Sequence, residues 1–169
     1  KALIEIVPLS EHNNDLLSDS FLVDSALLGL TDLSQAYVAR QDGVPVGVIL
    51  PLIAPEGYSG PIRMILGVDV SGTVKGVRVI THKETPGLGD KIDLKKSNWV
   101  LGFNGKSLSN TNVDEWHVKK DGGSFDQLTG ATITPRAIVR AVYKALQYYR
   151  DNQAELLAKI PAHQPLPDQ

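Results

Sequence analysis

The chain has 169 residues, of which 42% are hydrophobic and 21% charged, and its formal net charge is -2. This composition is typical of one globular domain, and so small a net charge argues against nucleic acid as a partner. Because the sequence contains no cysteine, disulfides, iron–sulfur clusters and cysteine nucleophiles are excluded. No run approaches the roughly 18 uninterrupted apolar residues of a membrane span.

The first predicted element is a helix over residues 15–30, where leucines and Phe21 recur at three- and four-residue spacings. Runs of β-branched residues then follow, separated by turn residues. They predict strands over residues 37–40, 46–50, 62–70 and 74–81. Apolar residues occupy every second position from Ile62 to Val70, so that strand should bury one face and expose Arg63 and Asp69. The sequence therefore predicts an antiparallel meander.

Residues 86–126 show no regular period, which predicts mostly loop with an apolar island at Trp99–Phe103. A long helix should begin near Pro135 and run to about Ala158. Its predicted buried stripe comprises Ile138, Val139, Val142, Leu146 and Tyr149. Prolines in residues 161–169 predict a flexible tail. We therefore expect an α+β fold in which residues 1–160 form one domain.

Three threonines gather just before the predicted helix. Thr134 followed by Pro135 is typical of an N-cap and the first helical position, and this accounts for Thr134. Thr129 suits a turn, which leaves Thr132 unexplained. Because a helix start presents unpaired N–H groups and partial positive charge, the surroundings of Thr132 favour a phosphate.

A second candidate site follows the strand that ends near Thr81, in the run HKETPGLGD from His82 to Asp90. Two glycines flanking a leucine, stiffened by a proline, form a loop whose backbone can approach a flat ligand. Taken alone, the run favours an ordinary Pro-Gly turn over a ligand site. Paired with the helix start, the loop could hold the two ends of a nucleotide-like cofactor.

The stretches EGYSGPIRMILGVDVSGTVKGVRVITHKETPGLGDKI and GGSFDQLTGATITPRAIVRAV resemble the FMN-binding domain of the G subunit of the Rnf electron-transport complex. The C subunit of the Na+-translocating NADH:quinone reductase is a more distant likeness. The resemblance extends from about Tyr37 to Leu146. It implies that a flavin transferase moves FMN from FAD onto Thr132, where it forms a phosphoester.

The resemblance also implies which residues belong to the FMN site. Glu84 to Gly89 should lie beside the isoalloxazine ring, and the segment from Asp126 should carry the motif that the transferase reads. The predicted cofactor-binding residues are Glu84, Thr85, Pro86, Gly87, Leu88, Gly89, Asp126, Leu128, Thr129, Gly130, Ala131, Thr132 and Thr134. Further basic residues that could stabilise reduced flavin or its phosphate are Arg63, Lys83, Lys91 and Arg136.

On this interpretation the chain relays electrons in a membrane complex and has no hydrolytic active site. The resemblance implies partner subunits, an N-terminal membrane helix that precedes this chain, and a domain facing the periplasm or cell exterior; the first residue, Lys1, fits an excised chain. Covalent attachment suits a compartment poor in free FMN. No metal site is expected, because His12, His82, His117 and His163 lack zinc-site spacings.

Two other classes of function stay open at this point. A regulatory or sensory FMN-binding module would share the same motifs but pass electrons to no fixed partner. A phosphate-binding scaffold without redox chemistry would use the helix start alone. Within the electron-transfer class, the alternative is that the chain is the C subunit of a Na+-translocating NADH:quinone reductase.

Overall fold

The structure is a computed structural model that describes residues 2–8 and 10–159. A single sheet has the strand order β1-β2-β3-β4-β5, and each strand is antiparallel to the next. The strands are β1 (Ser20–Val23), β2 (Ser34–Gln41), β3 (Val44–Ala54), β4 (Ile62–Asp69) and β5 (Val74–Thr81). The predicted antiparallel meander and α+β class are confirmed. The predicted tail, residues 161–169, lies outside the described residues.

The helix predicted over residues 15–30 is wrong. Two short 3-10 turns, η1 (Leu16–Ser18) and η2 (Ala26–Leu28), flank the edge strand β1 instead. Asp15 and Ser25 each cap one of these turns by accepting a backbone N–H two residues ahead. Between the turns, Phe21 and Val23 are buried while Leu22 is 51% exposed, which is the alternation of a strand rather than the face of a helix.

Strand β4 buries every second residue from Ile62 to Val68, as predicted. Ile62, Met64, Leu66 and Val68 are buried, whereas Val70 lies beyond the strand and is 39% exposed. Strand β3 is longer than predicted and continues past Pro51 to Ala54, opposite Ile62 in β4. This extension places Leu52 and Ala54 in the core.

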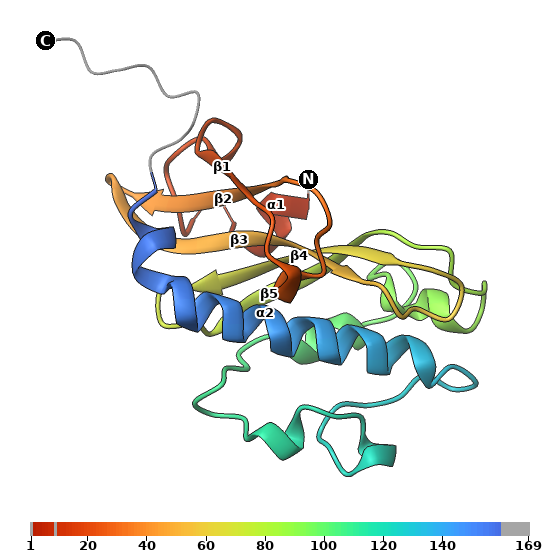
Figure 1. Cartoon of the computed structure of the whole chain (residues 1–169). Coiled ribbons are helices and arrows are strands. Elements are labelled where there is room, and N and C mark those ends of the chain that lie inside the picture. Colours follow the sequence, from red (N-terminus) through yellow and green to blue (C-terminus); the bar gives the residue numbers. More distant parts are fainter. Residues whose placement is uncertain (1, 9, 160–169) are drawn as a thin grey trace, which may run out of the picture.

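The long helix α2 (Ile133–Leu157) crosses one face of the sheet, where it encloses the main core (Figure 1). Its predicted stripe is buried at every position: Ile138, Val139, Val142, Leu146 and Tyr149. The Tyr149 hydroxyl donates a 2.7 Å hydrogen bond to the carbonyl oxygen of Val70. This bond ties the second half of the helix to the turn between β4 and β5.

The opposite face of the sheet is covered by the N-terminal helix α1 (Ala2–Ile6), which the sequence pattern did not reveal. Ile6 packs with Val7, Leu16, Ala39 and Ile49 in a second apolar cluster. A Cβ at Gly67 would lie 2.1 Å from Ile6 Cγ2, so only glycine allows this approach of helix to sheet. The Glu5 carboxylate pairs with Arg78 on β5 at 3.1 Å.

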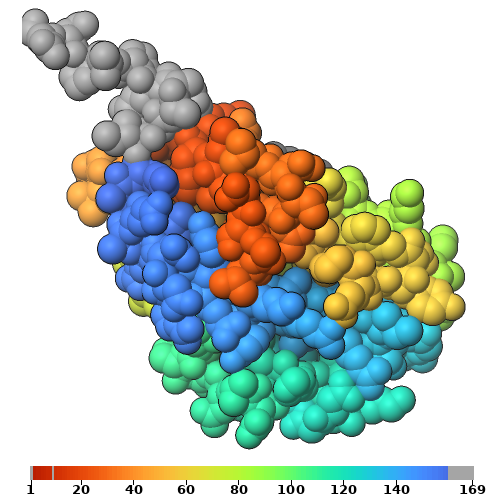
Figure 2. Space-filling model, in the orientation of Figure 1, coloured from red at the N-terminus to blue at the C-terminus, as the bar shows by residue number. Residues whose placement is uncertain are grey.

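The segment between β5 and α2 contains only short 3-10 turns, as predicted for a loop region: η3 (Gly89–Ile92), η4 (Trp99–Phe103), η5 (Val113–Glu115) and η6 (Lys119–Asp121). Phe103 of the apolar island stacks on Phe125 with ring centroids 4.9 Å apart. Figure 2 shows α2 at the surface between this segment and the N-terminal third of the chain. Within residues 2–8 and 10–159, no helix is long and apolar enough to cross a membrane.

Candidate functional site

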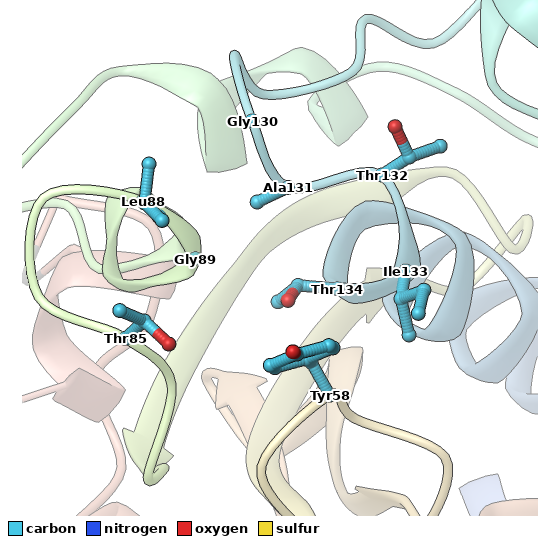
Figure 3. Close-up of a pocket in the computed structure, with 9 residues that line it drawn as sticks. All are labelled: Tyr58, Thr85, Leu88, Gly89, Gly130, Ala131, Thr132, Ile133 and Thr134. Carbon is cyan, nitrogen blue, oxygen red and sulfur yellow. The ribbon is translucent and has the colours of Figure 1, made fainter.

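A cavity of about 340 Å³ lies at the N-terminal end of α2. Three segments form it: the β3–β4 loop, the loop after β5, and the turn that leads into α2 (Figure 3). The lining residues are Tyr58, Thr85, Leu88, Gly89, Gly130, Ala131, Thr132, Ile133 and Thr134. The two segments that the sequence analysis paired are therefore neighbours, and the volume is within the range of small-molecule sites.

The loop after β5 is built on a tight turn from Thr85 to Leu88. The Leu88 N–H donates to the Thr85 carbonyl at 3.0 Å, and Gly87 has φ +80°. Pro86 and then Gly87 are the residues that a type II turn favours at its two central positions. Pro86 and Gly87 thus shape the loop without lining the cavity, while Leu88 and Gly89 face it.

The segment before α2 uses a similar turn from Leu128 to Ala131. The Ala131 N–H donates to the Leu128 carbonyl at 3.1 Å, and Gly130 has φ +73°. A Cβ at Gly130 would lie 3.1 Å from Leu88 Cδ2, so the two turns meet edge to edge. Leu128 points into the core and Thr129 is exposed, and neither lines the cavity.

The predicted role of Thr134 as N-cap is wrong. The N-cap is Thr132, the helix begins at Ile133, and Thr134 is a helical residue that is 1% exposed. The Thr132 side chain makes no capping hydrogen bond, and Pro135 has no N–H for it to accept from. Figure 3 shows the Thr132 hydroxyl pointing away from Tyr58. The Thr132 hydroxyl therefore lies at the rim of the cavity without capping the helix.

Among the described residues, no basic side chain lines the cavity. Of the four candidates, Arg136 is engaged elsewhere, because its Nε and one terminal nitrogen each donate to Asp121 at 2.7 Å. This pairing lowers the pKa of the Asp121 carboxyl and raises the pKa of Arg136. Positive potential at the cavity therefore comes from the start of α2, where Ile133 and Thr134 carry N–H groups without intrahelical acceptors.

Asp126 lies outside the cavity, on an open hollow that Leu128 also lines. Its carboxylate pairs with Lys119 at 2.7 Å, and both side chains are mostly exposed. His82 Nδ1 accepts a 3.0 Å hydrogen bond from the Glu84 N–H, so His82 helps to hold the loop after β5 in place. Within the described residues no three His, Asp or Glu side chains are arranged to hold a metal ion, and His163 lies outside that part of the chain.

Two lining residues, Tyr58 and Ile133, were not predicted from the sequence. Glu84, which was expected beside the flavin ring, lies behind the lining residues. Glu84 is 4% exposed and does not line the cavity. Tyr58 is 69% exposed and comes from the β3–β4 loop, where the sequence predicted only turn residues between two strands. The sequence feature that could have identified Tyr58 is that it is the one aromatic residue between Gly57 and Gly60.

The residues around this cavity match a known family. The sequence profile of a family described as FMN-binding domain matches residues 57–147, a span that holds all the lining residues. The chain belongs to this family. It is 51% identical over 156 residues to the G subunit of the ion-translocating oxidoreductase complex of Vibrio cholerae serotype O1 (strain M66-2), covering 92% of this chain and 75% of that protein.

Relatives from other genera carry the same description. The G subunit of Pseudomonas aeruginosa (strain UCBPP-PA14) is 54% identical over 160 residues, covering 94% of this chain and 74% of the relative. That of Shewanella amazonensis (strain ATCC BAA-1098 / SB2B) is 53% identical over 156 residues, with 92% and 73% covered. The predicted likeness to the G subunits of Rnf-type complexes is confirmed.

Proposed function

We propose that this chain carries FMN through a phosphoester to Thr132 and relays electrons within a membrane-bound, ion-translocating oxidoreductase complex. The family match and the G-subunit relatives support the cofactor and the setting. The covalent assignment rests on the Thr132 hydroxyl. It lies on the rim of the cavity at the start of a 25-residue helix, and it makes no capping hydrogen bond.

The attachment step accounts for the chemistry of that hydroxyl. Thr132 Oγ1 would attack the phosphorus of FAD that is attached to riboflavin. The bond between the two phosphates would break, AMP would leave, and the threonine hydroxyl would lose its proton. A flavin transferase would supply the catalysis. The helix start favours the product, because the phosphate would lie near the free N–H groups of the first turn.

The lining of the cavity suits a flat, partly apolar ring system. Leu88, Ala131 and Ile133 provide apolar contacts, and Tyr58 provides an aromatic face. Gly89 and Gly130 let the backbone come close. When bound, FMN exchanges one or two electrons, and the protein contributes position, nearby charge and shielding. Tyr58 and Leu88 are exposed, so a partner could reach the cavity from the surface.

The proposal extends to the setting of the domain. Other membrane subunits of an Rnf-type complex would be its electron donor and acceptor, and a membrane helix preceding this chain would hold it on the periplasmic or outer side. A phosphoester suits that side, because cofactor occupancy then no longer depends on free FMN.

The relay role is tested by comparing the isolated domain with the complex. The flavin-loaded domain should be reduced by dithionite yet oxidise NADH negligibly, because the chain contains no recognisable nicotinamide fingerprint. Thr132→Ala in the full complex should abolish electron flow through it. Rapid NADH oxidation by the isolated domain would instead favour a stand-alone reductase.

A further inference from the structure

The Glu84 carboxylate lies beside the cavity and joins the three segments that form it. Its Oε1 accepts a 2.6 Å hydrogen bond from Thr134 Oγ1 and a 3.0 Å bond from the Tyr58 N–H, and its Oε2 accepts a 2.8 Å bond from the Ser59 N–H. Thr134 belongs to α2, Glu84 to the loop after β5, and Tyr58 and Ser59 to the β3–β4 loop. One buried side chain thus links elements that are far apart in the sequence.

This arrangement has little freedom to rearrange. A carboxylate forms stronger hydrogen bonds than a neutral acceptor, and a buried one that loses its donors is strongly disfavoured. The packing is also tight, since a Cβ at Gly89 would lie 2.9 Å from Thr134 Oγ1 and 3.0 Å from Glu84 Cβ. The loop and the helix start are therefore held in one relative position.

The part of the site that depends most on this link is Tyr58. Its side chain is 69% exposed, so packing of the ring does little to place it. Figure 3 shows the ring beside Thr134 and Ile133, on the side of the cavity away from Gly130. Among the described contacts, the Tyr58 N–H donates to Glu84, which fixes the backbone from which the ring projects.

We propose that Glu84 is a positioning residue, whose carboxylate fixes the β3–β4 loop to the start of α2 so that the Tyr58 ring forms a wall against the flavin. The proposal rests on the proposed function for the identity of the ligand. The link itself belongs to the protein alone, and it can be measured without the cofactor.

The first test uses amide hydrogen exchange on the domain expressed without a flavin transferase. In Glu84→Ala the amides of Tyr58 and Ser59 should exchange faster by about tenfold or more, because each loses a carboxylate acceptor. Glu84→Gln, which keeps one acceptor oxygen, should lie in between and serves if Glu84→Ala does not fold. Glu56→Gln is the matched control, since the exposed Glu56 carboxylate of the same loop pairs with Arg140 instead.

The second test uses the domain loaded with flavin, compared at equal loading. Glu84→Gln and Tyr58→Leu should each shift the midpoint potential and flavin fluorescence in the same direction. The double variant should shift them no further than Tyr58→Leu alone, because both changes remove the same wall. A purely structural role for Glu84 would lower the melting temperature without this non-additivity.

The outcomes separate the two proposals. Wild-type exchange rates at Tyr58 and Ser59 in the Glu84 variants, or additive shifts in the double variant, would overturn the positioning role. A chain that accepts no flavin, or a Thr132→Ala variant that still carries it, would overturn the proposed function. The exchange experiment on the flavin-free domain would still decide on Glu84 in that case.

Discussion

The indole Nε1 of Trp99 donates a 2.7 Å hydrogen bond to the backbone carbonyl of Asp126. This bond joins the apolar turn η4 to the first residue of the segment that leads to Thr132. The Trp99 ring also meets Phe103 edge to face at 5.5 Å. The segment that a transferase would read is thus anchored at its upstream end by an aromatic residue packed on the core, while Thr129 and Gly130 remain exposed.

Trp99→Phe should retain much of the aromatic packing and lose the hydrogen bond. We expect faster hydrogen exchange across residues 126–131 and slower flavin incorporation during co-expression with a transferase, because the segment would be less well ordered. Incorporation is measured by the in-gel fluorescence of the denatured protein over time. Trp116→Phe is the comparison, since the Trp116 indole bonds instead to the Thr111 carbonyl. Equal incorporation in wild type and Trp99→Phe would contradict the anchoring role.

The two glycines of the loop after β5 should respond differently to substitution. Gly89→Ala places a methyl group 2.9 Å from Thr134 Oγ1, and such overpacking costs about 1–3 kcal/mol. It should also shift the visible spectrum of the bound flavin. Gly87→Ala meets no atom within 4 Å, so its cost is the strain of φ +80°, about 1–2 kcal/mol. Equal spectral shifts in both variants would show that loop geometry, not the contact with Thr134, controls the site.

Stability should fall at high pH because of Tyr149. Burial, with a smaller effect of the Asp69 carboxylate, raises the pKa of Tyr149 from 10.0 to about 12. Between these values the unfolded chain releases the phenolic proton and the folded chain keeps it. The free energy of unfolding should therefore fall as pH rises through this window, by about 1.4 kcal/mol per pH unit.

Urea unfolding from about pH 9 to pH 12 measures this dependence, since the window lies between the two pKa values. Tyr149→Phe removes the titrating group, so the free energy of unfolding of this variant should fall less steeply over the same window. The variant should start from a lower stability, because it loses the hydrogen bond to Val70. Parallel curves for wild type and Tyr149→Phe would mean that another group causes the decline.

The sequence predicted those parts of the fold that follow a local period. The alternation in β4 and the stripe of α2 were both recognised because each extends over many residues. The edge strand β1 was misassigned because it spans only Ser20–Val23, and the capped turns on either side add leucines at helical spacing. The start of α2 was misplaced by two residues, because the Thr134 hydroxyl bonds to Glu84, 50 positions away, rather than capping the helix.

The candidate site was predictable where glycine and proline fix a turn, and not where distant segments meet. The runs around Gly87 and Gly130 could be paired from their residue types. Tyr58 was recognisable only as the lone aromatic residue of its loop, because the loop is joined to the cavity by hydrogen bonds to Glu84, which is distant in the sequence. Nor could the pattern show that Glu84 turns its carboxylate toward that loop and Thr134.

The central claim is that FMN is attached to Thr132, and intact mass spectrometry of the denatured domain after co-expression with a flavin transferase tests it most directly. The account predicts a mass gain of one FMN minus one water for the wild type, and no gain for Thr132→Val. Peptide mapping should place the modification within residues 126–136. Retention of the added mass by Thr132→Val, or loss of all flavin from the wild type on denaturation, would contradict the account.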